Sequence, residues 1–352
     1  MKKLILIFLL FFLLPFIAHA ECVGPSFSAV QAAVTAANRG DTVEVCAGTA
    51  TWSSRLEITK AIKLIGAGRG SGGTKIYFAY GTEGTDLCGD CPINYAGSGG
   101  WGSIKYKPTD PQSDENEDFV ITGFDFNQDP SVYKVGGILI LNCSVNYPLR
   151  RVQIYSNNFK WRTDSGGQQT ALHLNFQGYV WGVVYDNVFE ARHPYFYMGG
   201  GNSMDATLTA TGPYPGNGCT WPLGNHYWEN MTAKTGTDQQ MVFEDNTLHY
   251  RDMWGSHFGG AGLGGTGYTV RYNNMYFYDD DRTYQNGWQL HGAYYSQYGA
   301  SNLEVYGNYF YGTSTMSDYA QSVIFCRSGR CTAWGNLFAA AGNQSAPFVS
   351  IG

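Results

Sequence analysis

A short phrase recurs along this chain: an Asn, then one variable residue, then a large apolar residue. The spacings between successive copies are 30, 59, 27, 35 and 28 residues. A period of this size is typical of a solenoid, in which each repeat packs against its neighbours. The copies place the repeat Asn at Asn157, Asn187, Asn246, Asn273, Asn308 and Asn336.

The residues before each repeat Asn alternate between apolar and variable, which predicts a strand with one buried face. A second strand is expected to begin at the large apolar residue. We expect the Asn itself to take the left-handed conformation of a sharp turn, and amides in coils about 4.8 Å apart to form a hydrogen-bonded ladder. The apolar residue three positions before each Asn is Ile154, Val184, Phe243, Val270, Val305 or Ala333.

The start of the chain has the pattern of a cleaved secretory signal, which we assign to residues 1–20. Two lysines precede an apolar run that ends in the small residues Ala18 and Ala20. We therefore expect an exported protein, secreted or held in the periplasm or at the cell surface, with no membrane insertion after cleavage of the signal.

The segment 26–68 predicts a helix followed by short strands. Ser28 can cap a helix, and Gly40 can end it before a strand at Val43 and Val45. One face of this helix would carry Val30, Ala33, Val34 and Ala37.

Together with "CAGTATW" and "LEITKAIKLIGAG", this segment resembles the capping helix and first coil of the pectin-lyase-like superfamily. The resemblance, with the Asn repeats, implies an all-β chain folded as a right-handed parallel β-helix (a solenoid) with an N-terminal capping helix at 26–68. It implies three strands per coil and a single domain over 21–352. Right-handed crossovers are also the general rule for parallel strands.

The resemblance implies a fold more than an activity. The superfamily includes polysaccharide lyases, glycoside hydrolases, phage tailspikes and non-catalytic surface proteins. The chain has neither the Gly-His-Gly segment with paired aspartates of polygalacturonases nor the "WIDH" and "RxPRxR" segments of the main pectate lyases.

Three segments depart from a regular coil. The first, Tyr80–Gly102, is interpreted as a loop. The 59-residue spacing indicates a long loop insertion at 199–240. The acidic stretch Thr109–Asp118 is interpreted as a solvated linker, with calcium binding by Asp114, Asn116 and Asp118 as the alternative. The final "APFVSIG" predicts an incomplete last coil.

All eight cysteines follow the signal, which favours disulfides in an exported chain. Zinc binding by "CGDC" is the alternative for one pair. The pairs that we expect are Cys22 with Cys46, Cys88 with Cys91, Cys143 with Cys219, and Cys326 with Cys331.

Outward positions two residues before the repeat Asn carry an aromatic stripe. Aromatic rings of this kind can bind sugars, although they also stabilise sheets through cross-strand pairing. We take the four aromatic members as candidate substrate-binding residues. With the two charged members, the stripe is Tyr155, Tyr185, Glu244, Arg271, Tyr306 and Trp334.

A second candidate site follows the repeat Asn, where four copies deliver Arg, His and Asp to one side of the solenoid. Surface ion pairs are the alternative interpretation, whereas the lone His173 and His226 are taken as structural. The candidate catalytic residues are His249, Arg251, Asp252 and His257, with Arg192 and His193 as substrate-binding residues and Asp279, Asp280 and Asp281 as a Ca²⁺ site.

Charge limits the class of partner. Without Lys2 and Lys3, the 22 basic residues fall to 20 against 28 acidic ones, a net charge of −8, which excludes a general attraction for nucleic acid. A polysaccharide is the expected partner. We expect a carbohydrate-active enzyme, a lyase rather than a hydrolase; the alternatives are a non-catalytic glycan-binding or adhesive surface protein and a structural solenoid.

Overall fold

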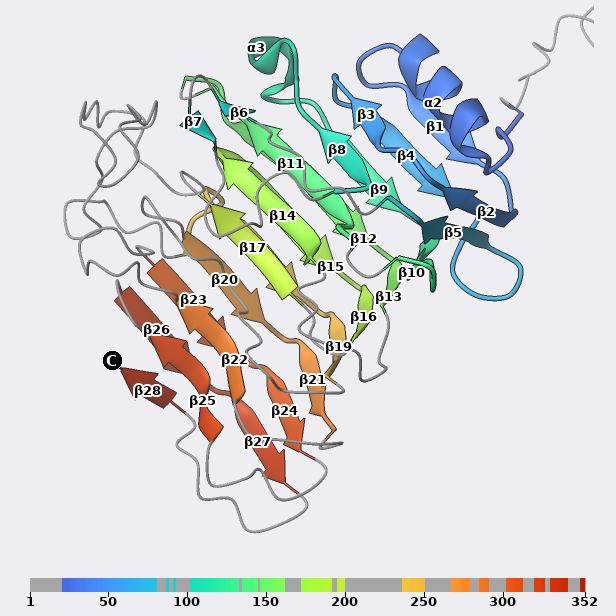
Figure 1. Cartoon of the computed structure of the whole chain (residues 1–352). Helices are drawn as coiled ribbons and strands as arrows, with labels where there is room; N and C mark the ends of the chain where they lie inside the picture. The colour runs from blue at the N-terminus through green and yellow to red at the C-terminus, as the bar shows by residue number, and fades with distance from the viewer. Residues whose placement is uncertain are drawn as a thin grey trace, which may run out of the picture.

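A computed structural model of the chain describes residues 21–80, 87–88, 91–92, 102–132, 135–144, 146–161, 172–191, 195–199, 236–250, 267–278, 285–290, 302–312, 320–326, 330–340 and 349–351. These residues are mostly β, and their long sheets are parallel. The strands of successive coils lie side by side from the N-terminal helix toward the C-terminus (Figure 1). Neighbours within each long sheet follow chain order, which is compatible with a β-helix or another solenoid.

Sheet one contains the strand that precedes the Asn in each repeat. Its strands, in spatial order, are β1 (Thr42–Val45), β4 (Lys63–Gly66), β9 (Phe119–Thr122), β12 (Leu149–Tyr155), β15 (Val180–Tyr185), β18 (Met241–Glu244), β20 (Gly267–Arg271), β23 (Asn302–Tyr306) and β26 (Arg330–Trp334).

Sheet two contains the strand that follows the Asn. Its strands are β2 (Gly48–Trp52), β5 (Thr74–Phe78), β10 (Phe124–Gln128), β13 (Asn158–Lys160), β16 (Val188–Ala191), β19 (Thr247–Tyr250), β21 (Asn274–Phe277), β24 (Tyr309–Gly312) and β27 (Leu337–Ala340).

The described third strands of the coils lie in separate sets of parallel strands. Five form sheet three, in the order β17 (Tyr195–Gly199), β14 (Leu172–Gly178), β11 (Ile138–Asn142), β8 (Ile104–Tyr106) and β3 (Leu56–Ile58). Three more pair as β22 (Gln285–Leu290), β25 (Ala320–Cys326) and β28 (Val349–Ile351), whereas β6 (Leu87–Cys88) and β7 (Cys91–Pro92) form a small antiparallel hairpin.

The 59-residue spacing between two repeat Asn residues corresponds to one coil. β15 pairs directly with β18, and Asn187 donates a hydrogen bond to Asn246, so no further coil lies between these strands. The residues that lengthen this coil, 200–235, lie outside the described residues.

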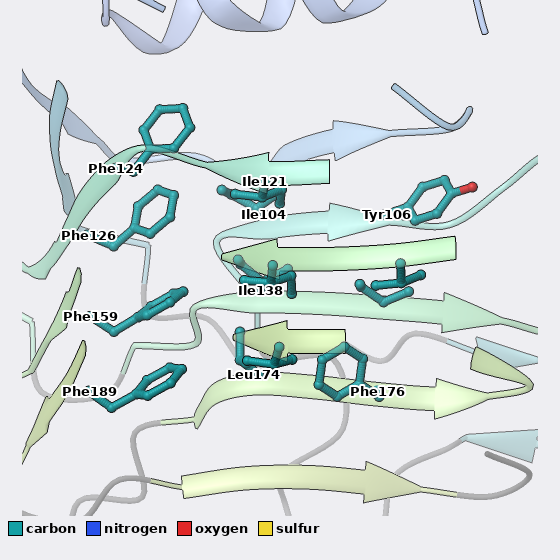
Figure 2. Packing of buried hydrophobic residues seen from close by; sticks show 14 of the residues in the cluster. Ile104, Tyr106, Ile121, Phe124, Phe126, Ile138, Phe159, Leu174, Phe176 and Phe189 are labelled. Atoms are coloured by element: carbon teal, nitrogen blue, oxygen red, sulfur yellow. The ribbon is translucent and has the colours of Figure 1, made fainter. Parts of the chain in front are cut away.

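The core is built from columns of side chains that repeat from coil to coil. In sheet two, Phe126, Phe159 and Phe189 are fully buried, with successive ring centroids 5.3 and 4.8 Å apart. Figure 2 shows these rings in one column beside the aliphatic side chains of the other sheets. The same register continues through Leu248, Met275, Phe310 and Phe338.

The amides of the six repeat Asn residues form the predicted ladder. Each Nδ2 donates to the Oδ1 of the next Asn at 3.0–3.1 Å, from Asn157 through to Asn336. Each amide also donates to backbone carbonyls; Asn187, for example, bonds the carbonyls of Ile154 and Tyr185. The ladder therefore ties every sharp turn to the turns of both neighbouring coils.

The prediction that the repeat Asn adopts the left-handed conformation is wrong. The residue before it does so, with φ of 50–64° at Ser156, Asp186, Asp245, Tyr272, Gly307 and Gly335. The turn must be completed one residue earlier, because the Asn backbone N–H has to face the next Asn Oδ1 while its amide points into the core.

The N-terminal helix α2 (Phe27–Ala36) packs against β1, β2 and β3 (Figure 1). Its Val30 and Val34 are buried, as the sequence pattern predicts. The N-cap is Ser26, whose Oγ accepts a hydrogen bond from Ala29 N, so the prediction of Ser28 as the cap is wrong. No helix among the described residues is long and apolar enough to cross a membrane.

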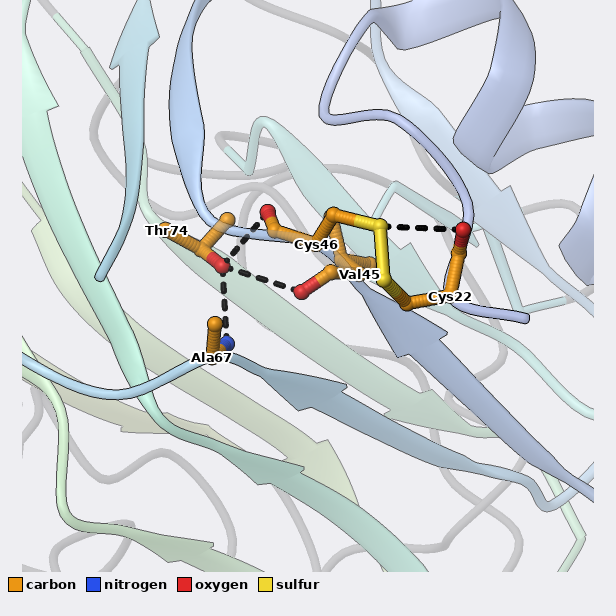
Figure 3. The surroundings of a disulfide bond; sticks show 5 residues. All are labelled: Cys22, Val45, Cys46, Ala67 and Thr74. Atoms are coloured by element: carbon orange, nitrogen blue, oxygen red, sulfur yellow. Dashed lines mark hydrogen bonds between the residues drawn. A yellow bond between two sulfur atoms is a disulfide. The ribbon is translucent and has the colours of Figure 1, made fainter. Parts of the chain in front are cut away.

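A disulfide joins Cys22 to Cys46 and holds the segment before α2 on β1 (Figure 3). Backbone hydrogen bonds between Val23 and the residues on either side of Val45 reinforce this attachment. Cys143 and Cys331 are also in disulfides, with partners outside the described side chains. The expected Cys88–Cys91 pair lies at opposed positions of the β6–β7 hairpin, and its bonding stays a prediction.

The acidic connector is anchored to the first coils, so the prediction of a solvated linker is wrong for Asp114. This residue ends the short helix α3 (Pro111–Asp114), is 1% exposed, and pairs with Arg39. The Tyr106 hydroxyl donates to its other oxygen at 3.1 Å. Glu115 and Asp118 likewise pair with Arg150 and Arg151 of sheet one.

Candidate functional site

The predicted aromatic stripe forms one column on the outward face of sheet one. Consecutive members are direct register partners on neighbouring strands from β12 to β26. We call this set the outer column of sheet one; it consists of Tyr155, Tyr185, Glu244, Arg271, Tyr306 and Trp334.

The rings of this column stack on one another. Tyr155 and Tyr185 have centroids 4.7 Å apart and planes 13° apart, and the corresponding values for Tyr306 and Trp334 are 4.1 Å and 13°. In each of these two pairs, one face of each ring is covered by its neighbour. Trp334 lies at the C-terminal end of the column and is 48% exposed.

The middle of the outer column of sheet one is an ion pair. Arg271 contacts the Glu244 carboxylate and donates a hydrogen bond to the Tyr306 hydroxyl at 3.0 Å. Burial, together with the nearby hydroxyl of Tyr155 and the charges of Asp186 and Glu244, raises the pKa of Tyr185. Tyr185 therefore stays protonated near neutral pH and is a poor general base.

A second column lies on the outward face of sheet two and combines ionisable and aromatic side chains. Its members are direct register partners on β13, β16, β19, β21 and β24, with strands about 4.8 Å apart. All five lie three residues after a repeat Asn. We call this set the outer column of sheet two; it consists of Lys160, Glu190, His249, Tyr276 and Tyr311.

His249 is held in the centre of that column by two tyrosines. Its ring stacks on Tyr276 with centroids 5.2 Å apart and planes 16° apart. Its Nδ1 lies 2.9 Å from the hydroxyl oxygen of Tyr278, which follows β21 directly. These two contacts fix the orientation of the imidazole. All three side chains are partly exposed, so the imidazole is still within reach of a ligand.

The next coil changes the orientation of the rings. The planes of Tyr309 and Tyr311 are 71° and 62° from that of Tyr276, and the two rings are 6.3 Å apart and 17° from parallel. Their register partners in β27 are Leu337 and Ala339, so no aromatic ring of β27 covers their faces. This pair therefore adds two partly exposed rings, of the kind that stack on sugars, to the surface of sheet two.

The predicted site residues fall on two surfaces. His249 belongs to sheet two, whereas the four aromatic candidates belong to sheet one, on the other side of the Asn turns. The remaining candidates lie outside the described residues: Arg192, His193, Arg251, Asp252, His257, Asp279, Asp280 and Asp281.

Several residues of the sheet two surface were not singled out from the sequence. Lys160, Glu190, Tyr276 and Tyr311 share with His249 the third position after a repeat Asn, which is the signal that finds them. Tyr278 occupies the fifth position, where three other copies have Arg162, Arg192 and Arg251.

Metal and histidine expectations have separate outcomes. Within the described ranges, no group of three or more His, Cys, Asp or Glu side chains is arranged to hold a metal ion. The Asp279–Asp281 cluster lies outside these described ranges, so calcium binding there stays a prediction. His173 is fully buried and stacks on Trp161 with centroids 4.7 Å apart, which places it in the core.

No protein-family model matches the chain, and no curated protein matches it in sequence. Among solved structures, the chain is similar to an alginate lyase from Paenibacillus sp. str. FPU-7. The identity is 15%, the alignment covers 92% of this chain and 98% of that chain, and the TM-score is 0.35. A likeness at this level carries no argument about activity, which has to come from the residues of this chain.

Proposed function

We propose that this chain is an exported carbohydrate-active protein that binds an extended polysaccharide on the outward face of sheet two and cleaves it by β-elimination. The observation that carries the proposal is the outer column of sheet two, where Lys160, Glu190 and His249 lie in register with tyrosine rings. A polymer that follows the stacked coils would meet charged groups and aromatic rings in succession.

The chemistry of this column suits a uronate polymer. Elimination needs a base for the C5 proton, a positive charge near the carboxylate, and an acid for the departing oxygen. The His249 imidazole can accept and donate a proton, and Lys160 supplies a positive charge two strands away. This cation also favours an acidic glycan locally, although the chain as a whole is acidic.

Residues predicted from sequence extend this proposal. Arg251 and His257 remain candidate bases or carboxylate clamps, with Asp252, Arg192 and His193 beside them in the repeat order. The three acidic residues Asp279–Asp281 would bind Ca²⁺, which would neutralise the uronate carboxylate and acidify the C5 proton.

The finer description of the fold is part of the proposal. We take the stack to be a right-handed parallel β-helix of the pectin-lyase-like type, with α2 as the cap of its first coil. The parallel order of the sheets and the packing of α2 on β1, β2 and β3 support it. An experimental structure with a left-handed path between successive coils would contradict it.

Export is supported by cysteine chemistry. The Cys22–Cys46 disulfide, with the disulfides of Cys143 and Cys331, fits an oxidising compartment such as the periplasm or the outside of the cell. Detection of a protein that begins at Glu21 in the culture medium or periplasm would test the assigned signal.

Non-catalytic glycan binding is the second candidate function. The exposure of Trp334, at the end of the outer column of sheet one, favours it, because an accessible indole ring can bind a sugar without any adjacent catalytic group. In that case the protein would retain glycans on an array and release no product.

One screen separates the two functions. The mature protein is incubated with polygalacturonate, alginate, hyaluronate and neutral plant polysaccharides, with Ca²⁺ or with a chelator. Unsaturated products that absorb at about 230 nm are expected from an elimination, since it creates a C4=C5 double bond conjugated to the carboxylate. Reducing ends without this absorbance would indicate hydrolysis, and binding without any product would favour the second function.

A further inference from the structure

The contact between His249 and Tyr278 combines ring stacking with a hydrogen bond, which stacking alone does not require. The Nδ1 atom and the phenolic oxygen are 2.9 Å apart, within the range of a normal hydrogen bond, and the two rings are 20° from parallel. The residues come from consecutive coils, β19 and the end of β21, so the register of sheet two sets their separation.

We propose that Tyr278 and His249 act as one proton-transfer pair in the cleavage of the polysaccharide, an inference that rests on the proposed function. In this pair Tyr278 contacts the sugar and His249 holds the proton in transit. With the imidazole in its Nε2–H tautomer, Nδ1 accepts a hydrogen bond from the phenol.

The step balances without any additional reactant. As the C5–H bond breaks, the Tyr278 oxygen takes the C5 proton and its own proton moves to His249 Nδ1. The electron pair left on C5 forms the C4=C5 double bond, and the C4–O bond breaks. The departing oxygen then takes a proton from the Tyr278 hydroxyl, which recovers one from His249 Nδ1. The net result is transfer of one proton from C5 to the leaving oxygen.

The surroundings fit a transfer pair. The stack on Tyr276 fixes the plane of the His249 ring, so Nδ1 stays directed at the phenol. Glu190 is the register partner of His249 on β16, on the opposite side of β19 from Tyr276, so the neighbouring strand carries an acidic residue next to a histidine that becomes positive in the reaction. Lys160, one strand further, supplies a charge opposite to that of a uronate.

The test uses three variants of the mature chain, Tyr278→Phe, His249→Gln and the double variant, with polygalacturonate, alginate and hyaluronate as probes. The matched control is Tyr77→Phe, which removes the same hydroxyl from the same face of sheet two on β5. The kcat and KM are measured from pH 5 to pH 10 by absorbance at about 230 nm, and folding is checked by circular dichroism and thermal melting.

The expected loss in kcat is about 100-fold or more for each single variant, with little change in KM, since general acid–base catalysis contributes about 10²–10⁴-fold. The double variant should be no slower than the worse single variant, because residues that act as a unit are not additive. The plot of kcat against pH for Tyr278→Phe should lose either its acidic or its alkaline fall. Tyr77→Phe should have the kcat, KM and pH profile of the wild type.

Three outcomes would overturn the pair. Full activity in Tyr278→Phe with an active wild type would remove Tyr278 from the chemistry and leave the proposed function standing. Losses that multiply in the double variant would mean that the two residues act separately. No elimination product from the wild-type protein with any probe would reject the pair together with the cleavage function. If Tyr278→Phe fails to fold, His249→Gln decides by the same criteria of kcat and pH profile.

Discussion

At the scale of single residues, the repeat Asn is the most constrained position of the coil. Asn273 shows why: its Oδ1 accepts from both the backbone N–H and the amide of Asn246, while its Nδ2 donates to Asn308 and to two backbone carbonyls. The side chain is 1% exposed, so water cannot replace these partners.

Asn273→Ala should lower the free energy of unfolding by about 1–3 kcal/mol, because buried donors and acceptors of both neighbouring coils lose their partner. Urea denaturation would measure the loss. Asn274→Ala is the matched control, since it deletes the same amide from the adjacent, exposed position. Equal stabilities for the two variants would argue against a stabilising ladder.

The residue before the Asn carries the strain of the turn. Asp186 and Asp245 both have positive φ, but only Asp186 has described contacts, which are a two-oxygen ion pair with Arg69 and a hydrogen bond from Ser156. Both Asp→Gly variants remove the backbone strain of positive φ, and both raise the conformational entropy of the unfolded chain. Asp186→Gly should therefore be less stable than Asp245→Gly by about 1 kcal/mol, as thermal melting would show. The reverse order would mean that the Arg69 contact contributes nothing.

Direction of side chains could be predicted at this scale, but backbone conformation could not. Alternation around each Asn correctly places Ile154 inward and Tyr155 outward. It does not tell which residue adopts the left-handed conformation, because Asp186 and Asn187 both have side chains that tolerate it. Only the requirement that the Asn amide reach the neighbouring coil decides between them.

At the scale of elements, the connector before β9 is attached through a buried cluster. Asp114 bonds Arg39 from the turn after α2 and Tyr106 from β8, and so links three elements of the first coils. Burial raises the pKa of Tyr106, and the charge of Asp114 raises it further. Burial also raises the pKa of Tyr268 in β20.

These two tyrosines predict a loss of stability in alkali. Above about pH 10 an unfolded tyrosine loses its proton while the buried one keeps it, so the folded state binds more protons and the free energy of unfolding falls as pH rises. The slope is about 1.4 kcal/mol per pH unit for each group. Urea denaturation between pH 9 and pH 11 should give a steep fall in the wild type and a shallower one in Tyr268→Phe. Parallel pH profiles would contradict the assignment.

The elements were predictable where their pattern is local. The strands on both sides of each Asn follow from apolar alternation, and the helix at α2 follows from Val30 and Val34. Its cap was misplaced, since Ser26 and Ser28 are both suitable residues and the contact of Trp52 Nε1 with the Pro25 carbonyl, which fixes the chain entering the helix, is not local. The burial of Asp114 likewise depends on Arg39, which is 75 residues away.

At the scale of the whole molecule, the solenoid places the two candidate surfaces on different sheets. The positions two before and three after each Asn are only five residues apart, yet they lie on different sheets. Tyr155 and Tyr185 stack on each other between coils, whereas Tyr309 and Tyr311 stack on each other along one strand. The two surfaces therefore present their rings in different orientations.

The candidates that follow β19 give a test at this scale. Arg251→Ala and His257→Ala should each remove most turnover while changing the free energy of unfolding by less than about 1 kcal/mol, as expected for substitutions outside the core. Initial rates and melting curves on the same samples would measure both. Full activity in both variants would move the catalytic centre away from this repeat.

The Asn ladder has a direction. In each amide-to-amide bond the Asn nearer the N-terminus donates and the next Asn accepts, and the first acceptor, Asn157 Oδ1, receives the N–H of Phe124. Dipoles aligned in this way polarise one another, so the five amide-to-amide bonds strengthen one another and do not act separately. A duplicated coil can be inserted anywhere within the row, because its Asn would accept a hydrogen bond from the preceding Asn and donate one to the next Asn. An Asp in the same place would terminate the row, which makes amide polarity a rule for lengthening this protein by design.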